Sequence, residues 1–461
     1  MPSYDTKVDD AKGYSSFTSL QIARTEIALN YISGVINVQF QKTTTASQLN
    51  TITFASNVQI DSAGYAYYPS DSFLGSDVFL NDDVDNKTLA DGKYGALTLI
   101  HELGHALGLE HTLSKATSTG QTSDPPYLSA IEDTTKWTVM SYNDSVDQYL
   151  LQYSELDIAA LQYIYGPSTN ARTGNDTYKL SSTTPNLIWD GQGIDTIDGS
   201  SINQPITLYL TPGEWGYIGS SRATYITSPG QITVNFGTVI ENAIGGSGND
   251  KLVGNTADNS LSGGAGNDLF IATLGTDTID GGVDTDTILF SGIYSTYTLS
   301  AGSNGTINVS SASLCSDAIS NVERFKFKDI WYANDTNANN AAQVIYAAFG
   351  KNYVKQFLST GISLADSGIS LNGLCEMVTN NHLVESISGL NTTKGYVDTL
   401  FNNVVGRIPT ALEELSFTSQ IDSGGMTKLG LLELAAAYSL TVSDVNALKV
   451  NLIGIPFEPA L

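Results

Sequence analysis

The sequence is poor in basic residues, in cysteine and in long apolar runs. Its 461 residues include 21 Lys and Arg against 47 Asp and Glu, which gives a formal charge of −26. A nucleic-acid partner would need a basic face, so we expect none. The two cysteines, Cys315 and Cys375, are too few for a disulfide framework; they either pair or remain separate buried thiols. No apolar run is long enough to span a bilayer, so we expect no transmembrane segment.

The amino terminus also lacks the features of a secretory signal. Residues 1–5 contain neither a basic cluster nor an apolar run. The length is sufficient for two to four domains, each with its own core. The acidic excess favours a chain that folds around calcium, whose ligands are carboxylates and carbonyls; the alternative is simply an acidic soluble surface.

Histidine is rare as well, but three of the four histidines fall between His101 and His111. On a helix, His101 and His105 lie one turn apart on the same face, so both imidazoles can reach one ion. Gly108 can take the left-handed backbone that ends the helix and returns His111 as a third ligand. Three nitrogens leave the fourth position of a zinc ion for water, and Glu102 is suited to accept its proton. The alternative is a helix with two solvated histidines.

A methionine follows this segment at a distance suited to a tight turn under the metal, in Val139-Met140-Ser141-Tyr142. The extended histidine motif with this methionine resembles the metzincin metallopeptidases. The tyrosine two places after the methionine resembles the serralysin branch of that group. The resemblance implies that Tyr142 ligates zinc at rest and then swings to stabilise the oxyanion, with Glu102 as the general base.

A nine-residue period begins at Gly245 and recurs at Gly254, Gly263, Ala272 and Gly281. Glycine-rich bends with Asp, each followed by a short apolar strand, are typical of the parallel β-roll of the repeats-in-toxin type, which binds calcium in the bends. A flexible linker, the alternative, would not place an apolar residue at a fixed phase. The residues expected to point inward are Leu252, Leu261, Leu269 and Ile288.

The resemblance to serralysins extends over residues 14–290 and implies calcium segments at 171–176 and 188–198, with a run into the roll at 241–245. From the repeats and the resemblance together we expect calcium ligands within these segments and within the nine-residue repeats. They are Arg172, Gly174, Asp176, Asp190, Gln192, Gly193, Asp195, Glu241, Gly246, Gly248, Asp250, Asn255, Ala257, Asn259, Gly263, Gly264, Gly266, Asp268, Asp277 and Asp286.

Some positions depart from the family pattern. Thr112 stands where a proline commonly follows the third histidine, and Val239 stands where the family offers a threonine to calcium. Ala272 and Asn259 replace the second glycine or the aspartate of their repeats. These departures put one calcium contact in doubt, and we expect some of the calcium sites to be weak or empty.

Around these motifs the periodicity predicts a helix from Phe17 to Tyr31, a metal-binding helix over 93–108 and another helix over 153–165. This order matches the upper half of a metzincin domain. The resemblance implies that strand 64–68 pairs with an extended substrate. The strand-like runs in this part are 35–40, 51–54, 64–68 and 77–80.

Beyond the roll, β-like alternation continues to about Ile330, and 334–340 is expected to be a polar linker. The following segments resemble a helical domain of unknown function at the ends of bacterial exported proteins. His382 is expected to be a plain surface or capping residue. The predicted helices are 341–350, 371–378, 393–405, 410–418, 428–438 and 443–452.

The sequence thus predicts a multidomain chain: an α+β metzincin catalytic domain (1–167), a calcium-binding parallel β-roll or β-sandwich (168–333) and an all-α domain (334–461). The expected protein is a secreted, calcium-stabilised zinc endopeptidase that cleaves proteins or peptides. By resemblance, type I secretion machinery exports it, with 452–457 as a candidate signal or simply the end of the last helix. The alternative is a calcium-dependent cell-surface or adhesion protein whose peptidase part mainly processes itself. The helical domain is expected to bind a surface or inhibitory partner.

Overall fold

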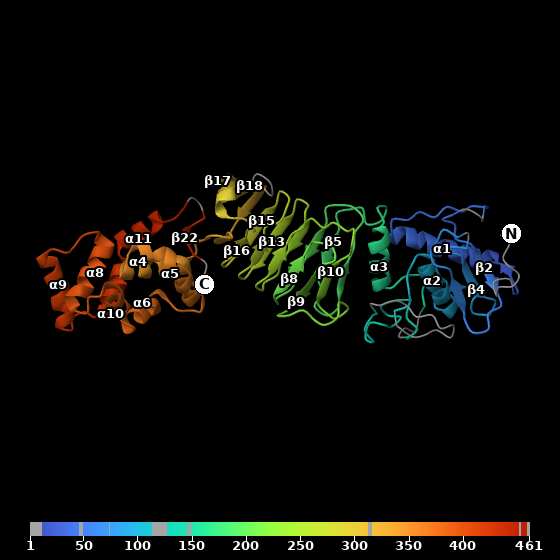
Figure 1. The fold of residues 1–461 in the computed structure, drawn as a ribbon, viewed down its shortest axis with the longest axis horizontal. Helices are drawn as coiled ribbons and strands as arrows, with labels where there is room; N and C mark the ends of the chain where they lie inside the picture. The colour runs from blue at the N-terminus through green and yellow to red at the C-terminus, as the bar shows by residue number, and fades with distance from the viewer. Residues whose placement is uncertain are drawn as a thin grey trace. The chain divides into compact units, whose positions relative to one another are not determined.

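The computed structural model describes residues 12–45, 49–72, 74–112, 127–144, 149–311, 316–450 and 453–458. These residues form two compact units. The first unit contains the chain up to 198 together with 209–242, and the second contains 199–208 together with the chain from 243 onward. The chain is therefore multidomain, with an α/β part, sheets rich in parallel strands, and a helical stretch (Figure 1). The three-domain boundaries drawn from the sequence stay predictions.

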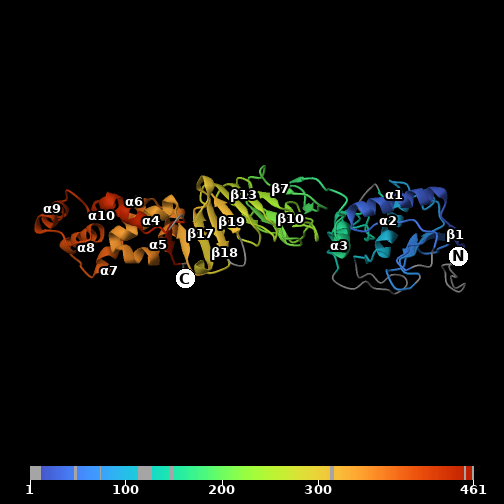
Figure 2. The same ribbon diagram turned by 90° about the horizontal axis from the view of Figure 1, so that it is seen from above.

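The α/β part of the first unit builds one apolar core from helices and a four-stranded sheet (Figure 2). Helix α1 (Ser19–Val35) begins at Thr18, which forms a capping box and so satisfies amides that the first turn leaves free. In the sheet, β2 (Phe54–Asn57) runs parallel to β4 (Val78–Asn81), and β3 (Gly64–Ala66) is antiparallel to β4 and lies at the edge. The other elements of this part are β1 (Ser15–Ser16), α2 (Tyr94–Ala106) and α3 (Glu155–Tyr165).

The strand predicted over 35–40 is wrong. Val35 ends α1, and Ile36 makes only an isolated antiparallel bridge with Pro167. The apolar residues of this run alternate because they pack on the core without a partner strand: Ile36 is fully buried, and Val38 and Phe40 are partly buried against the same cluster.

In the second unit, successive parallel strands of one sheet are separated along the chain by two of the nine-residue repeats. Leu252, Phe270 and Ile288 are Cα partners in successive strands of one sheet, and Leu261 is the partner of Ile279 in the other. All five side chains are buried. The apolar residue of each repeat therefore points inward, as the period predicts.

The prediction that Leu269 points inward is wrong. In β14 (Leu269–Ile271) the middle residue, Phe270, is fully buried and Leu269 is only half-buried. Side chains alternate along a strand, so the two neighbours of Phe270 face the other way. Phe270 is thus the true counterpart of Leu252 and Ile288.

The remaining roll strands are short. In the first unit, β5 runs parallel to β7, and β10 pairs parallel with β6 and antiparallel with β9. Their bounds, with those that follow in the chain, are β5 (Thr177–Lys179), β6 (Asn186–Ile188), β7 (Thr196–Asp198), β8 (Ile206–Tyr209), β9 (Trp215–Ile218), β10 (Gln231–Val234), β11 (Asn242–Ile244), β12 (Lys251–Val253), β13 (Ser260–Ala265), β15 (Thr278–Val283), β16 (Thr287–Leu289), β17 (Tyr297–Ala301), β18 (Ile307–Ser311), β19 (Ser316–Ser320), β20 (Arg324–Lys326), β21 (Trp331–Ala333) and β22 (Ile455–Phe457).

The apolar tail is a strand: β22 pairs antiparallel with β21, which pairs antiparallel with β20. The reading of this tail as the end of the last helix is therefore wrong for 455–457, because Ile455 and Phe457 bury their side chains in the helical core from an extended backbone. Leu452 lies outside the described residues.

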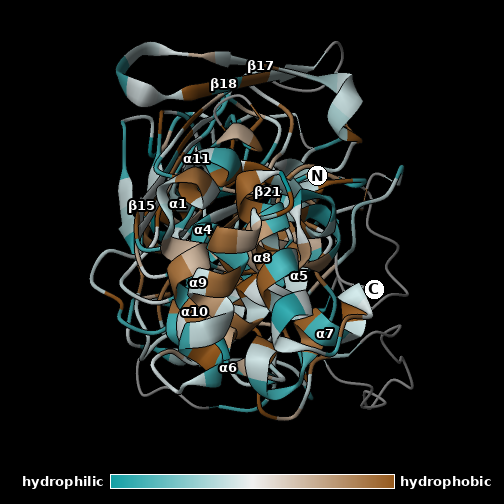
Figure 3. Ribbon diagram, turned by 90° about the vertical axis from the view of Figure 1, so that its left-hand side faces the viewer, coloured by the Kyte–Doolittle hydropathy of each residue, from teal (hydrophilic) through white to brown (hydrophobic). Residues whose placement is uncertain are grey.

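The helical stretch begins earlier than the sequence predicts. Asp335 accepts a hydrogen bond of 2.9 Å from the amide of Ala338, so it caps α4, and the linker expected over 334–340 is wrong from Thr336 onward. His382 is the residue that precedes α7, with a left-handed φ of 53°, which agrees with its expected capping place. Figure 3 shows hydrophobic and hydrophilic residues side by side on these helices. They are α4 (Thr336–Phe349), α5 (Lys351–Asp366), α6 (Leu371–Asn380), α7 (Leu383–Ser388), α8 (Thr393–Val405), α9 (Ala411–Asp422), α10 (Lys428–Ala437) and α11 (Ser439–Ala447).

Two helix triplets in this stretch, α4–α6 and α8–α10, contain the same two short sequence motifs, and the number of residues between the copies is the same for both motifs. Gly350-Lys351 after α4 corresponds to Gly406-Arg407 after α8. Asp366-Ser367-Gly368 at the end of α5 corresponds to Asp422-Ser423-Gly424 at the end of α9. These motifs indicate an internal duplication.

The two triplets differ in how tightly their first two helices pack. A Cβ on Gly361 of α5 would lie only 2.8 Å from the Cβ of Ala341 on α4, so these helices are in close contact. At the corresponding positions α9 and α8 carry Phe417 and Val397, which line an apolar cavity of about 420 Å³. The larger side chains thus hold the second pair apart.

Two observations concern the absences noted in the sequence. Among the residues described, none of the helices is long and apolar enough to cross a membrane. Cys375 is buried with a free thiol. Cys315 lies outside the described residues.

Candidate metal centre and calcium sites

Helix α2 positions the first two histidines. All residues from Gly95 to Ala106 are buried, so the helix is fixed on every side. His101 and His105 lie one turn apart, and Gly108 takes the left-handed φ of 101° that the sequence predicts. The chain therefore turns back, and one ligand nitrogen from each of His101, His105 and His111 lies within 4.8 Å of the others.

Backbone carbonyls fix the tautomers of the first two imidazoles. Nδ1 of His101 lies 2.7 Å from the carbonyl oxygen of Val139, and Nδ1 of His105 lies 2.7 Å from that of Leu109. A carbonyl oxygen can only accept, so each Nδ1 carries the proton and each Nε2 presents a lone pair. This is the arrangement of metal-binding imidazoles.

The Nε2 atoms converge on one point. Nε2 of His111 lies 3.2 Å from Nε2 of His101 and 3.0 Å from Nε2 of His105. Lone pairs at such distances repel one another unless a cation lies between them. Zn–N bonds of about 2.0–2.1 Å in a tetrahedral site place the nitrogens about 3.3 Å apart, so the three rings fit zinc.

Burial also keeps these rings uncharged. It lowers the pKa of His101 to about 4 and that of His105 to about 3, and it lowers the pKa of His111 as well. Neutral imidazole is the form that binds a metal. The histidine cluster is therefore ready to act as a ligand set near neutral pH.

Tyr142 completes the cluster from the methionine turn. Its hydroxyl lies 2.7 Å from Nε2 of His111, and the two ring centroids are 4.6 Å apart. Burial, with a smaller contribution from Glu102, raises the pKa of Tyr142 to about 12. The hydroxyl therefore stays protonated and can donate a hydrogen bond.

Glu102 lies on the same helix beside the first histidine. Burial raises the pKa of its carboxyl to about 8, and Oε2 has no hydrogen-bond partner among the described residues. The edge strand β3 passes close to it, since a Cβ on Gly64 would lie 2.9 Å from Cγ of Glu102. The arrangement leaves one carboxylate oxygen available to a water molecule or a substrate.

The methionine turn packs directly on α2. A Cβ on Gly104 would lie 2.6 Å from Sδ of Met140, so only glycine allows this contact. Asp157 of α3 accepts hydrogen bonds from the hydroxyl of Thr138, at 2.7 Å, and from the amide of Val139, at 2.8 Å. Helix α3 thus anchors the turn whose carbonyl orients the first imidazole.

A first acidic cluster lies in the segments expected to bind calcium. Carboxylate oxygens of Asp176, Asp190 and Asp195 lie within 4.8 Å of one another. Oδ1 of Asp190 and Oδ2 of Asp195 are buried and have no hydrogen-bond partner among the described residues. Burial raises the pKa of Asp190 to about 6. Unpaired carboxylate oxygens in one buried cluster fit a calcium ion.

Other expected ligands surround this cluster with their backbone or with hydrogen bonds. The guanidinium of Arg172 donates to the carbonyl of Trp189 at 2.7 Å and has no lone pair for a cation. The backbone oxygen of Arg172, which accepts the amide of Gln192 at 3.1 Å, is the group of this residue that can bind an ion. Oε2 of Glu241 accepts the amide of Asp195 at 2.8 Å. Gly174, Gln192 and Gly193 lie in the same loops.

Aspartates of the roll are linked across repeats. The amide of Asp250 donates to Oδ1 of Asp268 at 2.8 Å, and the amide of Asp268 donates to Oδ1 of Asp286 at 2.7 Å. Oδ2 of both Asp268 and Asp286 is buried without a partner among the described residues. Burial raises their pKa values to about 8 and about 7. These oxygens fit calcium in the same way.

The repeat glycines bring carbonyl oxygens toward these aspartates. A Cβ on Gly264 would lie 2.4 Å from the oxygen of Gly246, and one on Gly266 would lie 2.5 Å from the oxygen of Gly248. A Cβ on Gly263 would overlap Oδ2 of Asp268. The close approach requires glycine, as the spacing predicts.

The bends that contain Asn255, Asn259 and Asp277 form a second row, in which two of the expected calcium ligands are amides in place of carboxylates. The amide of Asn259 donates to Oδ1 of Asp277 at 2.9 Å, while Oδ1 of Asn259 accepts the amide of Asn255 at 2.8 Å. The amide of Ala257 donates to Oδ1 of Asn255 at 2.8 Å. The side-chain oxygens of Asn255 and Asn259 are already engaged and uncharged, so this row fits calcium less well than the row that contains Asp250, Asp268 and Asp286.

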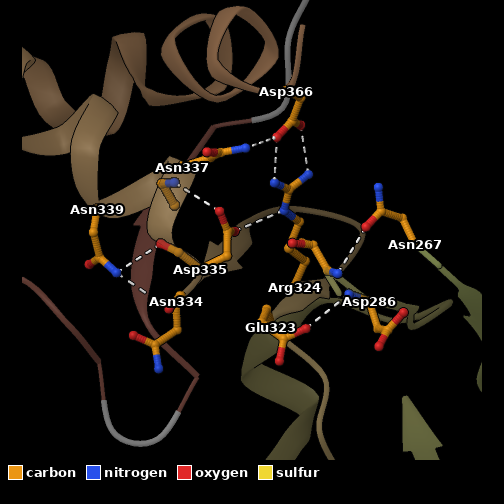
Figure 4. A network of polar contacts seen from close by, with 11 residues as sticks. Asn267, Asp286, Glu323, Arg324, Asn334, Asp335, Asn337, Asn339 and Asp366 are labelled. Atoms are coloured by element: carbon orange, nitrogen blue, oxygen red, sulfur yellow. Dashed lines mark hydrogen bonds and ion pairs between the residues drawn. The ribbon is translucent and has the colours of Figure 1, made fainter. Parts of the chain in front are cut away.

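Sequence reasoning missed three residues near these sites. The ring of Tyr68, 45% exposed, stands edge-on to His105 with centroids 5.4 Å apart. Thr238, the neighbour of Val239, accepts the amide of Asp190 at 3.1 Å through its hydroxyl. Glu323 accepts the amide of Asp286 at 2.9 Å (Figure 4), and the hairpin β17–β18 between them hides it from the nine-residue period.

The comparisons with known proteins agree with this geometry. The family model described as the serralysin C terminal of peptidase M10 matches residues 154–363. The chain is 33% identical over 283 residues to Serralysin G of Dickeya chrysanthemi, covering 55% of this chain and 57% of the relative. Metallopeptidase AprA of Pseudomonas marginalis is 33% identical over 54% and 57% of the two chains. The serralysin of Proteus mirabilis is 33% identical over 53% and 56%.

These matches show what the chain is similar to. Two histidines on a helix with a third after the turn, a methionine turn and calcium-type bends occur together with similarity to metallopeptidases. Residues 154–363 match the serralysin family model, and the resemblance to serralysins recognised from the sequence is confirmed. The chain spans about half the length of the curated relatives it matches.

Proposed function

We propose that this chain is a secreted, calcium-stabilised zinc endopeptidase that hydrolyses peptide bonds in proteins. The observation that carries the proposal is the convergence of three neutral imidazole nitrogens beside a buried carboxylate with an unpaired oxygen. His101, His105 and His111 would hold the zinc ion. When bound, zinc supplies Lewis-acid polarisation of the scissile carbonyl and makes water more acidic.

The other steps belong to side chains of this protein. Glu102, whose pKa of about 8 lies near neutral pH, accepts the proton of the attacking water and later donates it to the leaving amine. Tyr142, protonated across the neutral range, donates a hydrogen bond to the oxyanion. Both groups lie close to the histidine cluster, so one substrate carbonyl can reach them together.

Strand β3 is the proposed binding edge for the substrate. It is the last strand in its sheet and pairs only with β4 among the described strands. An extended peptide can add to such an edge through main-chain hydrogen bonds. Gly64 lies beside Glu102, so a peptide on this edge would pass the carboxylate.

Cleavage of a fluorogenic peptide by wild type and Glu102→Ala tests the proposal. We expect zinc-dependent cleavage by wild type, and in the variant a loss of kcat of at least about 100-fold with the zinc content retained. A wild type that binds zinc and cleaves nothing, or a variant that is as active as wild type, would refute the assignment.

Calcium would complete the fold outside the cell. Buried carboxylates that each have one oxygen without a hydrogen-bond partner among the described residues repel one another until an ion neutralises them, so the roll is proposed to form where calcium is abundant. Export by type I secretion machinery is proposed on the resemblance alone. The order of the roll with and without calcium is measurable by circular dichroism.

A second candidate is a calcium-dependent surface or adhesion protein in which the helical stretch carries the function. The apolar cavity of about 420 Å³ beside Phe417 favours it, because its volume falls in the range of ligand sites. Peptidase activity in neither wild type nor Glu102→Ala would favour this candidate.

A further inference from the structure

Asp133 is a buried carboxylate that accepts hydrogen bonds from Thr112 and Asn143, each of which directly follows a residue of the metal centre in the chain. Asp133 is 1% exposed. Its Oδ1 accepts a short hydrogen bond from the hydroxyl of Thr112, which directly follows His111. Its Oδ2 accepts a hydrogen bond of 2.5 Å from the side-chain amide of Asn143, which directly follows Tyr142.

The carboxylate is itself held firmly. The side-chain amide of Asn143 also donates to the backbone oxygen of Asp133, at 2.9 Å. The amide of Asp133 donates to the carbonyl of Ser129 at 2.8 Å, and the amide of Thr135 donates to the carbonyl of Asn143 at 2.9 Å. A fully bonded buried network of this kind is rigid and orders the segments that it joins.

His111 and Tyr142 need such support. His111 lies beyond the end of α2 and is only half-buried, and the side chain of Tyr142 is 62% exposed. Neither ring is fixed by close packing alone, yet the tyrosine hydroxyl and Nε2 of His111 lie 2.7 Å apart. Their relative position must therefore come largely from the backbone beside them.

We propose that Asp133 is a positioning residue that fixes His111 and Tyr142 relative to each other. This inference rests on the proposed zinc peptidase function. The contact through Thr112 controls the third metal ligand, and the contact through Asn143 controls the residue that meets the oxyanion. Proline, common in the family at the place of Thr112, has no hydroxyl, so this link depends on the threonine of this chain.

Single variants in the full chain separate the two contacts. Thr112→Val keeps the shape and removes only the hydroxyl, with Thr112→Ser as the matched control. Asn143→Ala removes only the amide, and Asp133→Asn replaces one acceptor oxygen with a donor. For each variant, the zinc Kd is measured by chelator competition, kcat and KM with one peptide, and Tm in saturating calcium.

We expect Thr112→Val to raise the zinc Kd by about 10-fold, as changes behind a metal ligand commonly do, and Thr112→Ser to restore it. Asn143→Ala should leave the zinc Kd within about twofold and lower kcat by about 10-fold at unchanged KM, because Tyr142 acts on the transition state. Asp133→Asn should change both the zinc Kd and kcat.

The inference is overturned if Asp133→Asn retains the wild-type zinc Kd and kcat. It is also overturned if Thr112→Val and Asn143→Ala each change both the zinc Kd and kcat, in proportion to the fall in Tm. A wild type that binds zinc but cleaves nothing refutes the peptidase function, while the Kd of Thr112→Val still decides the link to His111. A wild type that binds no zinc refutes both.

Discussion

The guanidinium of Arg324 holds the carboxylate of Asp366 through two parallel hydrogen bonds, each 2.8 Å long (Figure 4). Nε of the same arginine donates to Asp335, the cap of α4, at 2.9 Å. Arg324 lies in β20, directly after Glu323, which accepts the amide of the roll aspartate Asp286. The last turn of the roll is thus bonded to the first two long helices of the helical stretch.

Arg324→Lys should lower the free energy of unfolding of the second unit by about 1–3 kcal/mol, because a lysine cannot form the paired hydrogen bonds and Arg324 is only 13% exposed. Arg407→Lys is the matched control, since its pair with Glu413 is half-exposed and screened by solvent and should contribute much less. Urea denaturation in saturating calcium measures both. Equal effects of the two changes would contradict the expectation.

The contact should also show in the pH dependence of stability. Burial acts to raise the pKa of Asp366, but hydrogen bonds from Arg324 and Asn337 outweigh it and lower the pKa below its ordinary value of 3.8. A lowered pKa stabilises the folded state above that value, and the contribution is lost as the pH falls through the folded pKa. The difference in unfolding free energy between wild type and Asp366→Asn should therefore be constant at neutral pH and shrink below about pH 4. A difference that grows on acidification would refute this.

Gly64→Ala should lower kcat by at least about 10-fold, because the new Cβ would lie 2.9 Å from Cγ of Glu102 and must displace the carboxylate or the edge strand. Gly34→Ala in α1 is the control and should keep wild-type activity, because among the described residues its added Cβ would meet no atom within 4 Å outside its chain neighbours and the backbone of its own helix. Peptide cleavage is measured with zinc content checked for each protein. Full activity in Gly64→Ala would show that the strand and the carboxylate are not in this contact.

Asp268→Asn should have opposite effects with and without calcium. The asparagine can keep the oxygen that accepts the amide of Asp250, but it removes a buried acidic group whose Oδ2 has no hydrogen-bond partner among the described residues and whose ionisation burial disfavours. In a chelator the variant should be more stable than wild type by about 1–3 kcal/mol, and in millimolar calcium it should be less stable because a ligand is lost. Urea midpoints under the two conditions decide this, and a change of the same sign in both would exclude a calcium site at Asp268.

Gly361→Ala tests the close packing of α4 on α5. The added Cβ would lie 2.8 Å from Cβ of Ala341, so the substitution should destabilise by about 1–3 kcal/mol despite the better helix propensity of alanine. Gly430→Ala in α10, whose nearest atom would be 3.4 Å away, should be neutral or stabilising by up to about 1 kcal/mol. Thermal unfolding compares the two, and a stable Gly361→Ala protein would show that the helices can separate at little cost.

Local signals in the sequence were sufficient for the metal helix and for the roll. The spacing of His101 and His105, with Gly108 after them, sets where two imidazoles lie and where the helix ends, because both depend on helical geometry over a few residues. The nine-residue period likewise predicts the roll, although it predicts the inward side chain at Leu269, whereas the structure buries the next residue, Phe270. The α5 and α7 helices and the early start of α4 were missed. A polar residue such as Asp335 is as typical of a linker as of a helix cap, so the sequence alone does not show that it begins a helix.

By itself, the sequence determined the motifs that carry the resemblance to serralysins: three histidines and a glutamate on one short segment, a methionine turn, and glycine- and aspartate-rich repeats. These are properties of neighbouring residues, and their geometry follows from backbone conformation alone. Only the tertiary structure decided which distant groups support them. The carbonyl of Val139 orients His101, Asp133 joins the loops of His111 and Tyr142, and Arg324 joins the roll to Asp366. Such contacts join residues tens of positions apart, and no period in the sequence records them.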